Sequence, residues 1–183
     1  MATVDQTIEI DVPVSMAYNQ WTQFETFPEF MSGVDAVRQV DDTTLHFSTN
    51  TAGVHREYDA RILDQVPDSV ISWESMDGPR NAGLVRFEPL GPDRSRVSVT
   101  IEWTPEGLAE KAGSAVGIDD AQVGADLHKF KKFIENRAGE TGAWRETVTS
   151  GQVDDTFGGA GGGIGLDGIG LDEEPPPTGG RDF

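Results

Sequence analysis

Two polar side chains within one strand-like run are the candidates for chemistry in this sequence. Residues Val54 to Val66 alternate, and one face of the run carries Val54, Arg56, Tyr58, Ala60 and Ile62. The other face carries His55, Glu57, Asp59 and Arg61, so it is expected to meet water. An inward Arg56 could bind a carbonyl or carboxylate oxygen, and an inward Tyr58 could stack on a ring while its hydroxyl donates a hydrogen bond. The alternative for Arg56 is a place at the rim, with its head group in solvent.

Histidine and cysteine chemistry finds little support. His46, His55 and His128 are dispersed, and none forms a metal-spaced pair such as HxxxH, so we expect surface or boundary side chains. The absence of cysteine excludes disulfides, thiolate nucleophiles and cysteine metal sites. No glycine-rich phosphate loop follows a strand. The sequence therefore predicts neither a metal site nor a cofactor.

Charge and hydropathy exclude further classes of function. The 14 basic and 32 acidic residues give a net charge of -18, which would repel a phosphate backbone, so we expect no nucleic-acid partner. No run reaches the roughly 18–20 apolar residues that cross a bilayer, and the start MATVDQTIEI does not resemble a secretory signal. We therefore expect a cytoplasmic protein without an integral membrane segment. The sequence identifies no protein partner.

The composition changes near residue 149. The segment from Thr149 to Phe183 holds 11 of the 22 glycines. It contains 7 acidic residues and a single basic residue, Arg181. Such a segment cannot bury enough apolar surface to offset its chain entropy. We expect one folded domain over residues 1–148 and a disordered acidic Gly/Pro-rich tail over residues 149–183.

The folded part reads mostly as strands. Period-two alternation and turn residues predict seven strands, at Val4–Val12, Val34–Val40, Thr43–Ser48, Val54–Val66, Ser69–Met76, Gly83–Leu90 and Arg96–Trp103. Short turns between neighbours favour antiparallel pairing in a meander. After the first strand, helical spacing predicts a short helix over Val14–Trp21 and a second one broken at Pro28.

One long helix is expected near the end of the folded part. Asp119 and Asp120 suit its start, and Lys131, Lys132 and Arg137 suit its end. A single apolar stripe follows from Val123, Leu127, Phe130 and Ile134, with Phe133 beside it. The concave face of the sheet is the only large apolar surface that this stripe could cover. The fold class is therefore α+β.

Several short motifs carry a family resemblance. They are Pro13-Val14-Ser15-Met16-Ala17-Tyr18, Phe24 to Met31, Val85 to Gly91, and Phe130 to Glu135. Together with the element order, they resemble the START and birch-pollen-allergen-like (SRPBCC) superfamily, in its polyketide cyclase/dehydrase and coenzyme-Q-binding START branch, over about residues 2–148. The resemblance implies a helix-grip fold, in which a seven-stranded curved antiparallel sheet wraps a long C-terminal helix and leaves a deep apolar cavity. It also implies a carrier or binder of a quinone, lipid or polyketide, and in some members a cyclisation.

The inward parity of the strands and the apolar faces of the helices predict the lining of that cavity. The predicted ligand-binding residues are Trp21, Phe27, Phe30, Met31, Phe47, Arg56, Tyr58, Ile71, Trp73, Val85, Phe87, Val99, Trp103, Leu127 and Phe130. The alternative for each apolar member is a plain core position, since an apolar pocket and an apolar core look alike in sequence.

Three functions remain open. Binding or carriage of a hydrophobic small molecule is favoured because the inner face is aromatic and holds few polar groups. An aromatase-type polyketide cyclase/dehydrase is the alternative, with Arg56 and Tyr58 as its candidate catalytic residues. Related cyclases carry an arginine where this sequence has Ile62, a departure that favours binding without a reaction. The third function is a stress-related module that binds a partner through the acidic tail.

Overall fold

Pro13 separates the first strand from the first helix. Strand β1 (Ala2–Ile10) ends shortly before it, and α1 (Val14–Trp21) begins directly after it. Proline suits this place because the first turn of a helix does not need its backbone N–H. A 3₁₀ helix, η1 (Phe24–Glu29), follows and contains Pro28. The computed structural model describes residues 1–51, 53–105 and 120–154.

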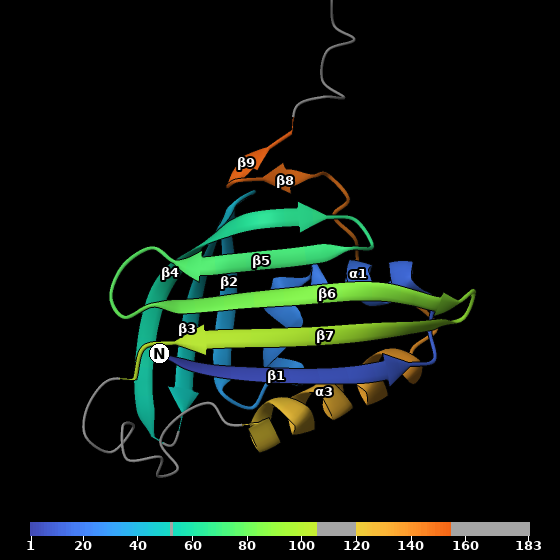
Figure 1. Cartoon of the computed structure of the whole chain (residues 1–183), viewed down its shortest axis with the longest axis horizontal. Coiled ribbons are helices and arrows are strands. Elements are labelled where there is room, and N and C mark those ends of the chain that lie inside the picture. Colours follow the sequence, from blue (N-terminus) through green and yellow to red (C-terminus); the bar gives the residue numbers. More distant parts are fainter. Residues whose placement is uncertain (52, 106–119, 155–183) are drawn as a thin grey trace, which may run out of the picture.

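The strands that follow form one antiparallel meander, as predicted. They are β2 (Val34–Asp41), β3 (Thr44–Thr51), β4 (Val54–Val66), β5 (Val70–Ser75), β6 (Asn81–Gly91) and β7 (Arg94–Trp103). Each pairs with its neighbour in sequence, and β1 joins the outer edge of β7, giving the order β1-β7-β6-β5-β4-β3-β2. In Figure 1 the sheet curves in front of α1, and α3 (Asp120–Glu135) runs along β1. This arrangement is the predicted helix-grip fold.

The apolar stripe of α3 is buried as predicted. Its buried residues are Val123, Leu127, Phe130 and Ile134, all packed into the single apolar core beneath the sheet. Asp120 lies in the first turn and Lys132 in the last, where each charge complements the helix dipole. Neither α3 nor any other described helix is long and apolar enough to cross a membrane.

Strand β4 changes its inward face partway along. Up to Ile62 the predicted alternation is confirmed: Ala60 and Ile62 are fully buried, whereas Asp59 and Arg61 are exposed. A register irregularity between Ile62 and Asp64 then shifts the pairing with β5. Because such a bulge reverses the alternation of side chains, Gln65 becomes a buried polar residue.

The sheet has nine strands instead of the predicted seven. Two short strands, β8 (Val148–Thr149) and β9 (Gln152–Val153), form a hairpin, and Val148 pairs with Gln65 of β4. Ser150 and Gly151 both have positive φ, as a two-residue hairpin turn requires. The boundary predicted at residue 149 therefore falls inside a hairpin. Residues 155–183 of the predicted tail lie outside the described residues.

The segment between α3 and β8 is fastened to α1 by buried polar groups. Gln20, which is fully buried, accepts a hydrogen bond from the backbone N–H of Thr141 at 2.9 Å and donates one to its hydroxyl at 3.0 Å. Asn19 donates to Glu140 at 2.7 Å. These contacts close the end of the core that lies beneath α1.

Candidate functional site

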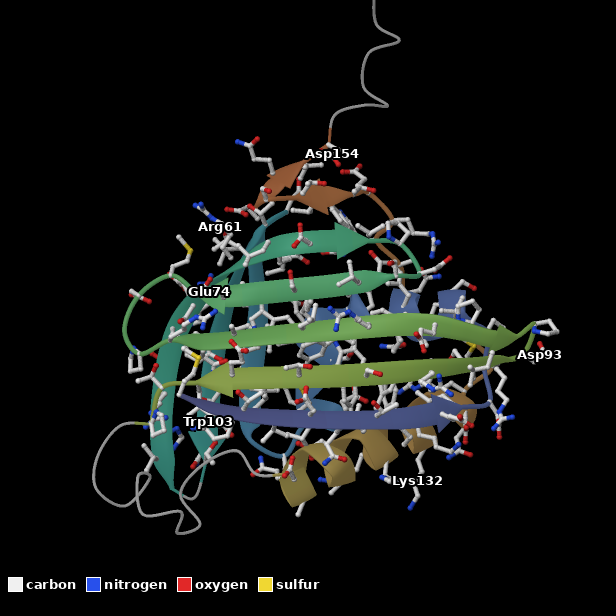
Figure 2. All side chains as sticks on the ribbon, in the orientation of Figure 1. Arg61, Glu74, Asp93, Trp103, Lys132 and Asp154 are labelled. Atoms are coloured by element: carbon white, nitrogen blue, oxygen red, sulfur yellow. The ribbon has the colours of Figure 1, made fainter. Side chains whose placement is uncertain are left out.

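A cavity of about 340 Å³ lies between the inner face of the sheet and the helices. Residues of β3, β4, β5 and β7 form its sheet side, and residues of α1, η1 and α3 form the other. Its volume suits a small organic molecule, since ligand pockets measure about 300–1,000 Å³. Trp103 lines the cavity, and Figure 2 shows this residue at the end of the sheet opposite to Asp93 in the β6–β7 turn.

Three aromatic rings form the sheet side of the cavity. The rings of Phe47 and Tyr58 are nearly parallel, with 11° between their planes and 5.3 Å between their centroids. Their residues are direct cross-strand partners, and 5.3 Å is close to the strand spacing of about 4.7–4.9 Å, so the two rings stand side by side on the sheet. The indole of Trp73 also stacks on Phe47, with 6.3 Å between the ring centroids and 20° between the planes. The edges of the Phe47 and Tyr58 rings therefore face the cavity. Because the edge of an aromatic ring is electropositive, it attracts oxygen atoms and the faces of other rings.

The helix side of the cavity is aromatic too, but its rings meet edge to face. Trp21 contacts Phe27 at 5.7 Å and Phe130 at 4.8 Å, with interplanar angles of 64° and 74°. Phe30 contacts Phe130 at 5.0 Å. The buried indole N–H of Trp21 has no acceptor among the described residues. Such interlocked rings fix the helix side of the cavity as a rigid wall.

Tyr58 supplies the polar group of the aromatic wall. Burial raises the pKa of its phenol above the ordinary value, and the nearby charge of Arg56 opposes this effect only partly. At neutral pH the hydroxyl is therefore protonated and can donate a hydrogen bond to a ligand. Arg56 is half-buried, lines the same cavity and lies closer to the β3–β4 turn. Tyr58 therefore points inward as predicted, and Arg56 lines the cavity from a half-buried position toward its rim, which is the alternative considered for it.

A hydrogen-bonded latch joins the segment between η1 and β2 to α3 beside the cavity. Asp126 lines the cavity and accepts hydrogen bonds from the backbone N–H of Ser32, at 3.1 Å to each oxygen, and from its hydroxyl at 2.7 Å. Lys129 contacts both the Ser32 hydroxyl and the Asp126 carboxylate. This latch fixes the segment Met31–Gly33, whose Met31 and Gly33 also line the cavity.

Most of the predicted ligand-binding residues are brought together. Eleven of them line the cavity: Trp21, Phe27, Phe30, Met31, Phe47, Arg56, Tyr58, Trp73, Val99, Trp103 and Leu127. The other four, Ile71, Val85, Phe87 and Phe130, are buried but lie outside the lining. Phe87 packs against Tyr18 of α1 at 5.4 Å, and Phe130 lies between Trp21 and Phe30. All four are therefore core residues, and helix side chains pack directly on the rings of Phe87 and Phe130.

Several lining residues were not predicted from the sequence. Thr49 and Thr51 lie on β3 beyond its predicted end, although they share the parity of the inward Phe47. Ile101 shares the parity of Val99, and Asp126 lies next to Leu127 on the helix. Parity extended along whole strands would have found the first three. Nothing in the sequence distinguishes Asp126 from the other helix carboxylates.

The histidines make contacts on the outside of this site. His46 pairs with Asp59 at 2.7 Å, and His55 lies 3.5 Å from Asp35. His128 contacts the backbone oxygen of Gly124, one turn earlier in α3. None of the three lines the cavity, and the described residues contain no group of three or more His, Asp or Glu side chains that could hold a metal ion.

Comparisons with known proteins identify a family and agree with this fold. The family model for polyketide cyclase / dehydrase and lipid transport matches residues 10–130. An uncharacterized 17.2 kDa protein from the melC2-rnhH intergenic region of Streptomyces lincolnensis is 46% identical over 149 residues, covering 81% of this chain and 99% of that protein.

Two solved structures show the same fold at low sequence identity. The Zhui aromatase/cyclase from Streptomyces sp. R1128 has a TM-score of 0.60 at 13% identity, over 75% of this chain and 96% of that one. A START superfamily protein from Mycobacterium smegmatis has a TM-score of 0.56 at 15% identity, over 74% and 95%. Together with the sheet order and the cavity beneath the sheet, the match of the family model over residues 10–130 leads to one assignment: this chain belongs to the polyketide cyclase/dehydrase and lipid-transport family.

Proposed function

We propose that this protein binds a hydrophobic small molecule, one with a ring and an oxygen acceptor, in the cavity beneath its sheet. A quinone or a polyketide-like compound has this chemistry, and a lipid that carries a ring would also fit it. The observation that carries the proposal is the neutral hydroxyl of Tyr58 within a wall of aromatic rings. Ligand sites of this kind combine a mostly apolar lining with a few polar groups that fix orientation.

The cavity is better equipped for binding than for proton transfer. Cyclisation of a poly-ketone requires a group that accepts a proton and a group that stabilises the developing enolate. The raised pKa of Tyr58 makes its phenol a donor and a poor base at neutral pH. Among the lining carboxylates, Asp126 is engaged by Ser32, and Glu57 and Asp77 are exposed. Binding or carriage needs no group that accepts a proton, so the described side chains suit it better than they suit catalysis.

Native mass spectrometry of the full chain, purified from its own host, tests this proposal. A co-purifying molecule near one per chain is expected, and extraction would identify its class. Emodin, a three-ring quinone with hydroxyl and carbonyl groups, then serves as a defined probe in fluorescence titration. An empty protein that also fails to bind emodin, 2-naphthol and a lipid extract would overturn the proposal.

A cyclase/dehydrase activity is the second candidate function. Arg56 and Tyr58 share one face of β4 and both line the cavity, where a cation and a hydroxyl donor could stabilise an enolate oxygen. The family model and the aromatase/cyclase of similar fold support this candidate. Ile62, where related cyclases carry an arginine, is fully buried and outside the lining. The required result is turnover of a poly-ketone substrate by the wild type that is lost in a folded Arg56→Ala variant. Unchanged products in the variant would exclude the role of Arg56, and a wild type without turnover would exclude the activity.

Two expectations from the sequence stay predictions. The third function, partner binding through the acidic tail, concerns residues that the structure does not describe beyond Asp154. A deletion of residues 155–183 tests it and spares the β8–β9 hairpin. The cytoplasmic location is also untested, and fractionation of host cells would check it.

A further inference from the structure

Gly83 lies near the start of β6, directly opposite Trp73 of β5. Three atoms of the Trp73 indole, Cζ2, Cε2 and Cη2, lie within 2.6 Å of the point where a Cβ at residue 83 would be. Real Cβ atoms essentially never come closer than 3.0 Å to another heavy atom. The aromatic ring thus occupies the space that any other residue at position 83 would need.

The backbone of Gly83 gives no other reason for a glycine. The glycines with positive φ in the described part of the chain are Gly53, Gly78 and Gly151, so Gly83 has a conformation open to every residue. Glycine inside a strand weakens it and often marks the close approach of another group. Glycine at position 83 is therefore explained by the space that the indole of Trp73 needs.

The seat of Trp73 also sets one wall of the cavity. The indole is 5% exposed, lines the cavity and stacks on Phe47, whose ring stacks in turn on Tyr58. A side chain at residue 83 would push the indole away from the backbone of β6, toward Phe47 and the cavity. In a cavity of about 340 Å³, a displaced indole takes up a large share of the space.

We propose that Gly83 is the position that determines how large a ring system this cavity accepts, because it seats the indole of Trp73 against the sheet. Gly83 does not itself line the cavity, so it acts through Trp73 as a positioning residue. This inference rests on the proposed binding function and adds a size limit to it. A larger residue at this position would restrict the cavity to smaller ligands.

Two probes of different size test the inference on the full chain. In Gly83→Ala, the affinity for three-ring emodin is expected to fall at least tenfold, while that for two-ring 2-naphthol changes less than threefold. A double variant, Gly83→Ala with Trp73→Leu, removes the clash, and its emodin affinity is expected to lie within threefold of that of the single variant Trp73→Leu, which also lacks the indole. Gly91→Ala is the matched control, because nothing lies within 4 Å of a Cβ at that position of the same strand.

The outcomes distinguish a failure of the role of Gly83 from a failure of the proposed binding function. A wild-type protein that binds neither probe contradicts the proposed function. A wild-type protein that binds both, with a Gly83→Ala variant that keeps emodin or loses both probes equally, overturns the role of Gly83 alone. If Gly83→Ala does not fold, the double variant decides: folding and emodin binding equal to those of Trp73→Leu support the role of Gly83, and a double variant that does not fold or binds more weakly than Trp73→Leu contradicts it.

Discussion

Arg145 holds the carboxylate of Asp68 through two hydrogen bonds, at 3.0 and 2.8 Å, and donates to the side-chain oxygen of Asn19 at 2.7 Å. The hydrogen bond to Asp68 is the main reason that the pKa of Arg145 is raised. One guanidinium thereby ties the segment after α3 to the β4–β5 turn and to α1. Planar two-point contacts of this kind are specific to arginine.

Replacing Arg145 with alanine is expected to lower the free energy of unfolding by about 1–2 kcal/mol, since the ion pair is partly exposed but Asn19 is buried and loses a partner. Urea denaturation measures this change. Arg38→Ala is the control, because Arg38 is an exposed residue of β2, and its effect should stay within about 0.5 kcal/mol. Equal effects of the two substitutions would show that the contacts of Arg145 with Asp68 and Asn19 add no stability.

Alkaline pH should destabilise the fold through Tyr18. Burial raises the pKa of this tyrosine to about 12, whereas the unfolded chain keeps a value near 10.0. Between these values the unfolded state has lost the proton and the folded state has not, so stability is full below pH 10 and falls as the pH rises toward 12. The expected slope from this residue is about 1.4 kcal/mol per pH unit.

A Tyr18→Phe variant should lose less stability than the wild type between pH 9 and 11, in the same urea denaturation experiment. The chain has only two tyrosines, so Tyr58→Phe isolates the second contribution, and the absorbance of tyrosinate reports each residue separately in the single variants. Parallel stability curves for the wild type and Tyr18→Phe would contradict the prediction.

Removing the hydroxyl of Tyr58 should weaken binding of ligands that accept a hydrogen bond. One hydrogen bond contributes about 0.5–1.5 kcal/mol, so Tyr58→Phe is expected to raise the Kd for emodin by about 2- to 10-fold. The Kd for naphthalene, which has no oxygen, should not change. Tyr18→Phe is the control because Tyr18 is fully buried outside the cavity lining. Equal loss for both ligands would mean that the phenol acts through packing alone.

Opening the latch at Asp126 should loosen one side of the cavity. Asp126→Asn removes the charge that holds Ser32 and Lys129, so amide hydrogen exchange at Ser32 is expected to speed up by about tenfold, and emodin should dissociate faster. Asp120→Asn serves for comparison, since the hydrogen bond that its carboxylate accepts within the described part of the chain is a long one, 3.4 Å from Gln6, and Asp120 does not line the cavity. Unchanged exchange at Ser32 would show that other contacts fix this segment.

The sequence was sufficient for the repeating parts of the fold. The stripe from Val123 to Ile134 was predicted and is buried, because a helix period of 3.6 residues is set locally. The inward side of β4 was predicted as far as Ile62. Beyond Ile62, the bulge depends on how β4 and β5 pair. No residue type in the strand indicates this register shift, so the burial of Gln65 was not predicted.

The site was harder to predict than the fold because a cavity is defined by what does not reach it. Val85 and Val99 are cross-strand partners with the same inward direction, yet only Val99 lines the cavity. Helix side chains also decide the fate of Phe87, the next inward residue of β6, because Tyr18 and Trp21 of α1 pack against its ring. Their position depends on how α1 packs, a tertiary property that strand parity does not contain.

The short β8–β9 hairpin has a consequence for how the protein behaves among other copies of itself. β3 pairs with β4 only as far as Arg61, which leaves the backbone of the last residues of β4 without that neighbour. Val148 and the backbone N–H of Gly151, which donates to Leu63 at 2.8 Å, occupy this stretch instead. An unpaired strand edge is a template for adding a foreign strand. The hairpin therefore covers this edge of β4. Its own strands have two residues each and are too short to pair with another chain in an aggregate.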